Sequence, residues 1–267
     1  MNRAGRGKAA QYWAQSQVTQ VWQGHLLARA DALELKSSSD YSEADIKIYL
    51  GEIAGKHFFA VHKEIAEGAG QTLREIAGLL DEVQLEIAVT SLALINWHES
   101  HPRCPRCGNE TEVTANGWVR KCIVDGSQHF PRTDPAIIVA VQDRAGRICL
   151  GRQAIWPEGR YSNFAGFVEP GESLEDAVIR EVEEESGLQV RDIRYLYSQP
   201  WPFPNSIMLA YEAFTDNPEL AKPDGEEIVD LKWFTKDALR SSIADGSLNL
   251  PPVTSVSRKM IERWLNG

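Results

Sequence analysis

A short acidic stretch of this chain carries the residues best suited to chemistry. Arg180, Glu181, Glu184 and Glu185 follow Glu172 within one run of sequence. On a helix, Glu181 and Glu185 stand one turn apart with Glu184 beside them, so three carboxylates share one flank. Because like charges repel, such a flank favours a neutralising cation, and carboxylate oxygens suit Mg²⁺ or Mn²⁺. The pattern predicts a divalent-metal site, with Arg180 paired to Glu184 or Glu172.

The same stretch carries the signals of the helix that would position these groups. Ser173 can cap its start, where the acidic residues of the first turn favour the positive end of the helix dipole. Gly187 can end it in a left-handed conformation. Between them, apolar residues recur at intervals of three and four, which predicts one buried stripe: Leu174, Ala177, Val178 and Val182. An acidic, solvated helix face is the alternative interpretation.

The stretch from Gly166 to Leu188 also fits the pattern G-x5-E-x7-R-E-U-x-E-E-x-G-U, where U is apolar, at every fixed position. With average residue usage, a chance match has odds of about 10⁻⁷. The pattern is the signature of the Nudix hydrolases, which this chain therefore resembles. That family uses metal ions to hydrolyse nucleoside diphosphates linked to another group.

The resemblance implies roles for individual residues. The metal ligands would be Glu181, Glu184, Glu185, Glu227 and the backbone carbonyl of Ala165. Glu227 is otherwise an ordinary loop charge. Bound metal ions would lower the pKa of a water and neutralise charge on the phosphoryl oxygens. Glu185 is the preferred general base and Glu184 the alternative, and Arg180 completes the catalytic set.

A second motif, Ser198 to Ser206, reads SQPWPFPNS. Its prolines favour an extended segment that cannot be a central strand. Trp201 and Phe203 would present aromatic faces to a base, or simply pack on the domain. The motif resembles the mark of the NADH pyrophosphatase branch of the Nudix family. That resemblance implies cleavage of NADH or NAD⁺ to AMP and nicotinamide mononucleotide, and in some relatives removal of NAD caps from RNA 5′ ends.

Substrate-binding residues follow from the same resemblance. The segment itself supplies Gln199, Pro200, Trp201, Pro202, Phe203, Pro204, Asn205 and Ser206. Arg74, Phe130 and Ser257 occupy further substrate positions of the family, although Arg74 is equally a surface charge on a helix. Two other functions stay open: a Nudix enzyme acting on ADP-ribose or dinucleoside polyphosphates, and a non-catalytic nucleotide sensor.

A cysteine pattern predicts a small zinc-ribbon-like segment. Cys104 and Cys107 form a CxxC, and Cys122 follows where a second CxxC is expected. Asp125 stands at the fourth position, where relatives usually have cysteine, and His129 is a nearby substitute. A zinc site with Asp125 or His129, and a ribbon that has lost its metal, are both open. Cys149 lies in a strand-like run and is expected in the core.

Composition sets the broad class. The 267 residues are 43% hydrophobic and 25% charged, as in soluble globular proteins. The net charge of −10 opposes nonspecific binding to long nucleic acids and favours small nucleotides or a single RNA end. Lacking an apolar run of membrane-spanning length and the apolar stretch of a secretory signal, the chain is expected in the cytoplasm, away from membranes. Family members are often homodimers, which the resemblance extends to this chain.

The expected fold is α+β, in three parts. Residues 1–100 form an N-terminal α+β domain, 101–132 the ribbon-like segment, and 133–267 a Nudix α/β/α sandwich. Hydrophobic patterning predicts strands at 56–62, 136–142, 148–152, 161–166, 207–214 and 228–234. It predicts helices at 81–97, 236–243 and 253–265.

Overall fold

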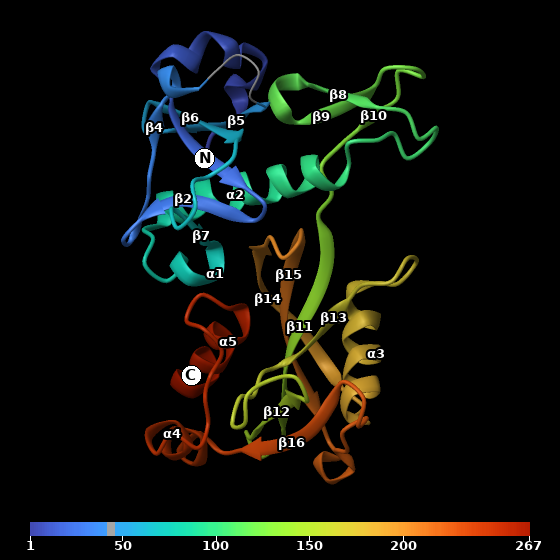
Figure 1. Ribbon diagram of the computed structural model, residues 1–267. Coiled ribbons are helices and arrows are strands. Elements are labelled where there is room, and N and C mark those ends of the chain that lie inside the picture. Colours follow the sequence, from blue (N-terminus) through green and yellow to red (C-terminus); the bar gives the residue numbers. More distant parts are fainter. Residues whose placement is uncertain (42–45) are drawn as a thin grey trace. The chain divides into compact units, whose positions relative to one another are not determined.

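The computed structural model describes residues 1–41 and 46–267, and the chain divides into two compact units (Figure 1). The first unit contains Met1–Thr133 together with Trp201–Asn205. The second contains Asp134–Pro200 and Ser206–Gly267. The boundaries expected at residues 100 and 132 stay a prediction.

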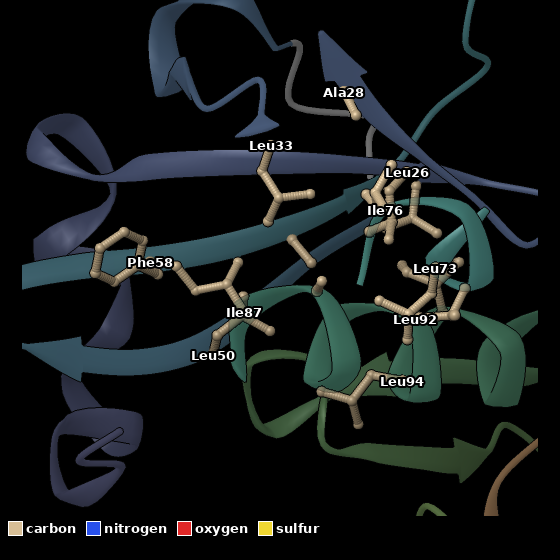
Figure 2. Packing of buried hydrophobic residues seen from close by; sticks show 14 of the residues in the cluster. Leu26, Ala28, Leu33, Leu50, Phe58, Leu73, Ile76, Ile87, Leu92 and Leu94 are labelled. Carbon is tan, nitrogen blue, oxygen red and sulfur yellow. The ribbon is translucent and has the colours of Figure 1, made fainter. Parts of the chain in front are cut away.

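The first unit is built on a sheet whose main path runs β3-β2-β1-β6-β5. Helix α2 (Glu82–Ser100) begins where the Asp81 carboxylate accepts the Gln84 N–H at 2.8 Å. Its apolar side, including Ile87 and Leu92, packs against sheet residues such as Leu26 (Figure 2). The strands are β1 (Gln17–Trp22), β2 (His25–Arg29), β3 (Ala32–Leu33), β4 (Lys36–Ser37), β5 (Ile46–Ile53), β6 (Lys56–His62) and β7 (Gly70–Thr72). Shorter helices are η1 (Ala4–Gln15), η2 (Ser38–Asp40) and α1 (Leu73–Ile76).

The ribbon segment lies in the same unit as a separate sheet of order β10-β9-β8. It packs closely on β5, because a Cβ on Gly117 would lie 2.7 Å from the backbone of Ile48. It also contacts α2, where buried Arg120 donates to His98 Nδ1 at 3.0 Å. Its elements are β8 (Thr111–Thr114), η3 (Ala115–Gly117), β9 (Val119–Cys122) and β10 (Gln128–His129).

The second unit is a sheet of order β14-β15-β11-β12-β16 with helices on both faces. Along β11 (Asp134–Asp143), Ile137 and Val139 pack with α3 (Leu174–Ser186), and Ile138 packs with α4 (Lys236–Ala244) and α5 (Val256–Asn266). This alternation produces the expected α/β/α sandwich. The other elements are β12 (Ile148–Gln153), β13 (Phe164–Phe167), β14 (Arg191–Trp201), β15 (Ser206–Thr215), β16 (Ile228–Phe234) and η4 (Pro218–Leu220).

The predicted strands and helices are confirmed to within three residues at each end, and two starts lie three residues later than expected. The strand expected from residue 161 begins at Phe164, because Tyr161 is buried in the core beneath α5 and its hydroxyl donates to Asp230. The last helix begins at Val256, after Ser255 caps it by accepting the Arg258 N–H. Cys149 is buried in β12 as expected. Within residues 1–41 and 46–267, no helix has both the length and the apolar character needed to span a membrane.

Candidate active site

Helix α3 has the two ends that its sequence predicts. Ser173 Oγ accepts the Asp176 N–H at 3.1 Å, and Gly187 ends the helix with a φ of 66°. Ala177, Val178 and Val182 are fully buried against the sheet. Because both ends and one face are held, the acidic flank of the helix has a defined orientation.

Arg180 is the centre of a network that links this flank to the loop before the helix. Its guanidinium donates to both carboxylate oxygens of Glu172, at 2.7 and 2.9 Å. It also donates to Glu181 at 2.7 Å, to Glu184 at 3.0 Å and to the Phe167 carbonyl at 2.9 Å. The Arg180 contact is the main reason that the pKa of Glu172 falls to about 2. Both partners expected for Arg180 are therefore engaged at once.

Gly166 is required by the position of Glu181. A Cβ on Gly166 would lie 1.9 Å from Glu181 Cδ, so any larger residue would displace that carboxylate. Gly166 lies in β13 opposite Ile137 of β11, which holds it at the sheet. The neighbouring Ala165 donates its N–H to the carboxylate of Glu185. Strand β13 therefore positions two of the predicted metal ligands.

Glu185 is the most unusual carboxylate of the site. Its side chain is 4% exposed, and its Oε2 has no hydrogen-bond partner in the part of the chain that the structure describes. Burial, followed by the charges of Glu227 and Glu181, raises the pKa of Glu185 to about 8. Burial also raises the pKa of Glu181, against the opposing effect of Arg180. A buried, unpartnered carboxylate oxygen beside two further carboxylates fits a divalent cation.

The other predicted ligands lie nearer to solvent. Glu227 is exposed and accepts the Gln153 amide N–H at 2.9 Å. The Glu184 side chain is 60% exposed and bound to Arg180. Among the described residues, the carboxylates of α3 are not part of a compact group of three or more potential metal ligands. Mg²⁺ keeps several waters and uses substrate phosphates, so it does not require such a compact group.

The proline-rich segment is divided between the two units. In the second unit, Gln199 donates to the Thr254 carbonyl at 2.8 Å and accepts from Lys259 Nζ at 3.0 Å. In the first unit, Trp201 and Phe203 meet edge to face at 5.0 Å. The Arg74 guanidinium lies 4.2 Å from the Phe203 ring. The expected aromatic pair is therefore present, with Phe203 packed partly on the core and Arg74 beside both rings.

The remaining substrate positions differ in exposure. Phe130, in the first unit, is 62% exposed and available to a ligand. Ser257, in the second, is 4% exposed, and its hydroxyl accepts from Asn163 and Ser162. In the segment, Pro202 and Ser206 are buried, Asn205 is half-buried, and Pro200 and Pro204 are exposed.

Three residues near the site were not predicted from the sequence: Asn163, Gln153 and Lys259. Their contacts join positions far apart in the chain. Asn163 could have been suspected from its place just before β13, the strand that contains Gly166. The sequence carries no local signal for Gln153 or Lys259.

The ribbon brings a second set of potential ligands together. Among the described residues, Cys104, Cys107, Cys122 and Asp125 offer atoms that all lie within 4.8 Å of one another. Cys122 Sγ accepts the N–H groups of Val124 and Asp125, each at 3.4 Å. Asp125 Oδ1 accepts from Ser127 Oγ at 2.5 Å, which leaves Oδ2 directed at Cys104, 3.9 Å away. Three sulfurs and a carboxylate oxygen fit tetrahedral zinc.

His129 is the alternative fourth ligand. Its Nε2 lies 3.3 Å from Cys104 Sγ and 3.1 Å from Ser127 Oγ. His129 therefore touches the cluster at its edge. It is not a member of the compact group formed by Asp125 and the cysteines. The arrangement favours Asp125 as the ligand and His129 as a hydrogen-bond partner of Cys104.

Comparison with known proteins locates this chain among its relatives. Residues 132–263 match the NUDIX domain. A solved NUDIX hydrolase from Nitrosomonas europaea covers 61% of this chain and 90% of its own, at 20% identity and a TM-score of 0.49. The NAD-capped RNA hydrolase NudC of Mycobacterium bovis is 40% identical over 234 residues, which are 81% of this chain and 74% of that protein. The human NAD-capped RNA hydrolase NUDT12 is 35% identical over 70% of this chain and 43% of its own length. The chain therefore belongs to the Nudix hydrolase family, in the branch that contains these two relatives.

Proposed function

We propose that this protein is a metal-dependent NAD(H) diphosphatase, which cleaves the pyrophosphate to AMP and nicotinamide mononucleotide and also removes NAD caps from RNA 5′ ends. The observation that carries the proposal is the buried Glu185 carboxylate, whose neighbouring charges are Glu227 and Glu181, the second of which is bonded to Arg180. The choice of NAD(H) among Nudix substrates is supported by the SQPWPFPNS segment and by the names of the relatives.

The proposed metal ions are Mg²⁺ or Mn²⁺. Glu181, Glu185, Glu227 and the Ala165 carbonyl would hold them, with Glu184 at the solvent side. When bound, the metal ions would activate water and neutralise charge on the pyrophosphate. Arg180 keeps Glu181 and Glu184 in place through the contacts at 2.7 and 3.0 Å, and Gly166 leaves room for the Glu181 carboxylate.

Glu185 is the proposed general base. Burial and the neighbouring carboxylates raise its pKa to about 8. A cation bound beside it would lower that pKa and leave the carboxylate able to accept a proton near neutral pH. Its Oε2 has no partner among the described residues and is free to take the proton of the attacking water. Glu184 is a weaker candidate, because it is 60% exposed and engaged by Arg180.

Recognition of the dinucleotide is assigned to aromatic and cationic side chains. Trp201 and Phe203 offer ring faces on which a base can stack, and Arg74 adds a guanidinium beside them. Phe130 is a further exposed ring. Within the second unit, Gln199 is held by the Thr254 carbonyl, and Ser257 is held by Asn163.

Three further assignments accompany this function. The ribbon is proposed to hold a structural Zn²⁺ through Cys104, Cys107, Cys122 and Asp125. A homodimer and a cytoplasmic location are proposed from the family resemblance and the composition. Each can be checked separately, by metal analysis, by sedimentation and by fractionation of cells.

The experiment that tests the function compares substrates on one protein. NADH, NAD⁺, ADP-ribose, ATP and an NAD-capped RNA are incubated with Mg²⁺ or Mn²⁺, and the products are separated by chromatography. We expect AMP and nicotinamide mononucleotide from NADH or NAD⁺, and release of the mononucleotide from the capped RNA. Turnover of ADP-ribose alone would leave Nudix chemistry and overturn the specificity. Binding without any turnover would indicate a nucleotide sensor.

A further inference from the structure

The first turn of α5 and the residues just before it contact two separate parts of the second unit. Ser257 lies in this turn, with Thr254 three residues before it and Lys259 two residues after it. Ser257 is bonded to the residues that precede strand β13, whereas Thr254 and Lys259 are bonded to the proline-rich segment. One short element therefore joins the strand of the metal site to the segment assigned to substrate.

On the strand side, the Ser257 hydroxyl is the meeting point of three donors. It accepts from Ser162 Oγ at 2.8 Å, from the Asn163 N–H at 3.1 Å and from the Asn163 side-chain amide at 3.0 Å. Asn163 also donates to the Ser257 carbonyl at 3.3 Å. Asn163 and Ser257 are 5% and 4% exposed, so water does not replace these bonds readily.

The bonds of Asn163 act on the metal site through the chain itself. Asn163 is followed by Phe164, Ala165 and Gly166 of β13. Ala165 donates its N–H to Glu185, and Gly166 lies directly beneath the Glu181 carboxylate. A shift at Asn163 would therefore be passed to both contacts, because Ala165 and Gly166 follow only two and three residues later in the paired strand β13.

The amide of Asn163 is itself only partly satisfied. Its Oδ1 is buried and has no hydrogen-bond partner among the described residues. An unpaired buried acceptor is unfavourable, so a side chain chosen for packing alone would be apolar at this place. The bonds that the side chain does make come from its amide nitrogen, which donates to the Ser257 hydroxyl and carbonyl.

On the segment side, the contacts are more exposed. Gln199 accepts a hydrogen bond from Lys259 Nζ at 3.0 Å and donates one to the Thr254 carbonyl at 2.8 Å. Gln199 immediately precedes Pro200, and proline restricts the backbone of the residue before it. Gln199 lies near the end of β14, so these two bonds hold the strand where it leads into the segment.

We propose that Thr254–Lys259 is a positioning clamp, in which Ser257 and Asn163 align the metal-binding strand while Lys259 and Thr254 align the substrate segment through Gln199. The proposal rests on the function assigned above and names residues that act through Glu185, Glu181 and Gln199 rather than on the substrate. Its two arms have different kinetic consequences, because one serves the metal site and the other serves binding.

The decisive variant for the strand arm is Ser257→Ala, which removes one oxygen and leaves three donors without it. We expect kcat for NADH to fall by about 10- to 100-fold with a smaller change in KM, since a displaced catalytic strand affects the reaction more than binding. Ser257→Thr, which keeps the hydroxyl, should restore part of the loss. The matched control is Ser255→Ala, which removes the cap of the same helix and none of the clamp bonds.

The segment arm is tested by Lys259→Met, an exposed change that should leave folding intact. We expect the KM for NADH to rise several-fold and kcat to change less. If Ser257→Ala and Ser255→Ala lower Tm equally and both keep wild-type kcat, the strand arm is only structural and the proposal fails. Equal effects of Lys259→Met on kcat and KM would overturn the division between the arms.

Binding of Mn²⁺, followed by electron paramagnetic resonance, separates this proposal from the assigned function. Ser257→Ala should weaken Mn²⁺ binding relative to Ser255→Ala even if the wild-type protein does not hydrolyse NADH. An inactive wild type with this difference would overturn the function and retain the strand arm. If Ser257→Ala changes neither Mn²⁺ binding nor kcat, the proposed clamp is wrong.

Discussion

The acidic helix of the second unit and the cysteine ribbon of the first prepare metal ligands in different ways. In the ribbon, four ligand atoms already lie within 4.8 Å of one another among the described residues. On α3, Arg180 bonds to Glu181 and Glu184, and Glu185 is turned inward against the Ala165 N–H. The three thiols and the carboxylate of the ribbon suit zinc bound only by side chains, whereas the helix suits a hard ion that shares its shell with water and substrate.

This difference reflects the source of each geometry. Helical periodicity alone places Glu181, Glu184 and Glu185 on neighbouring positions, and an arginine keeps their charges balanced. The ribbon needs two turns whose backbone N–H groups face sulfur, as at Cys122. A metal should therefore matter for activity in the second unit and for stability in the first.

The largest expected effect is on the catalytic side of this comparison. Glu185→Gln removes the proposed base and one ligand charge while keeping the shape of the side chain. We expect kcat for NADH to fall by about 10³-fold, within the range typical of general bases. The control is Glu183→Gln, an exposed change on the same helix. Near-normal turnover by Glu185→Gln would transfer the role to Glu184.

Loss of a ribbon ligand should lower the stability of the first unit. Cys122→Ser replaces a buried sulfur of the four-atom group and should abolish stoichiometric zinc, with a loss of about 3 kcal/mol or more in the stability of the first unit. Asp125→Asn should give a smaller loss of zinc affinity, because the three thiols persist. Metal analysis and thermal unfolding measure both. A protein that carries no zinc, with Tm unchanged in Cys122→Ser, would identify the ribbon as metal-free.

Gly166→Ala tests the close approach of strand and helix. The added Cβ would overlap the Glu181 carboxylate, which lies 1.9 to 2.2 Å from its position. We expect activity to fall by roughly 100-fold, since a displacement of about 1 Å can have that effect, while Tm changes little. Gly7→Ala, where no atom lies within 4 Å of the added Cβ, is the matched control. Wild-type activity in Gly166→Ala would show that Glu181 has room to move.

The smallest predicted effect is a loss of stability at acid pH, caused by His98 at the contact between the ribbon and α2. Burial lowers the pKa of His98 to about 4, and the Arg120 charge acts in the same direction, against the Gly117 carbonyl. Arg120 donates to Nδ1, so the ring is neutral and donates from Nε2 to Gly117. The unfolded histidine binds a proton below pH 6.5, where the folded one does not. The contribution of His98 to stability is therefore complete above pH 6.5 and falls as the pH drops towards 4.

At pH 4.5 the loss due to His98 should be about 2 kcal/mol relative to pH 7, measured as the difference between the wild type and His98→Gln. The difference is needed because Glu185, whose pKa is raised to about 8, stabilises the fold over the same fall in pH. Urea unfolding followed by tryptophan fluorescence measures it, and His98→Gln should flatten the dependence in this window. The stabilising contribution of Glu172, whose pKa is lowered from 4.5 to about 2, is present above pH 4.5 and is lost between about pH 4.5 and 2. An unchanged pH profile in His98→Gln would assign the acid sensitivity to other groups.

Much of this molecule could be read from local patterns. The caps of α3 at Ser173 and Gly187, and its buried stripe, follow from short-range rules that hold in any context. The strand at Lys56–His62 likewise has the bounds that its apolar run predicts. The later starts at Phe164 and Val256 follow from a buried tyrosine and a serine cap, which depend on packing.

The sequence by itself determined the identity and spacing of the pattern residues between Gly166 and Leu188, and with them the family and its expected metal chemistry. Only the tertiary structure decided that Glu185 is buried, that Gly166 lies under Glu181, and that Asn163 and Ser257 meet. It also decided that Trp201 and Phe203 belong with the first unit. The physical reason is distance along the chain: helical periodicity and caps act over a few residues, whereas burial and hydrogen bonding between remote segments depend on how the whole sheet packs.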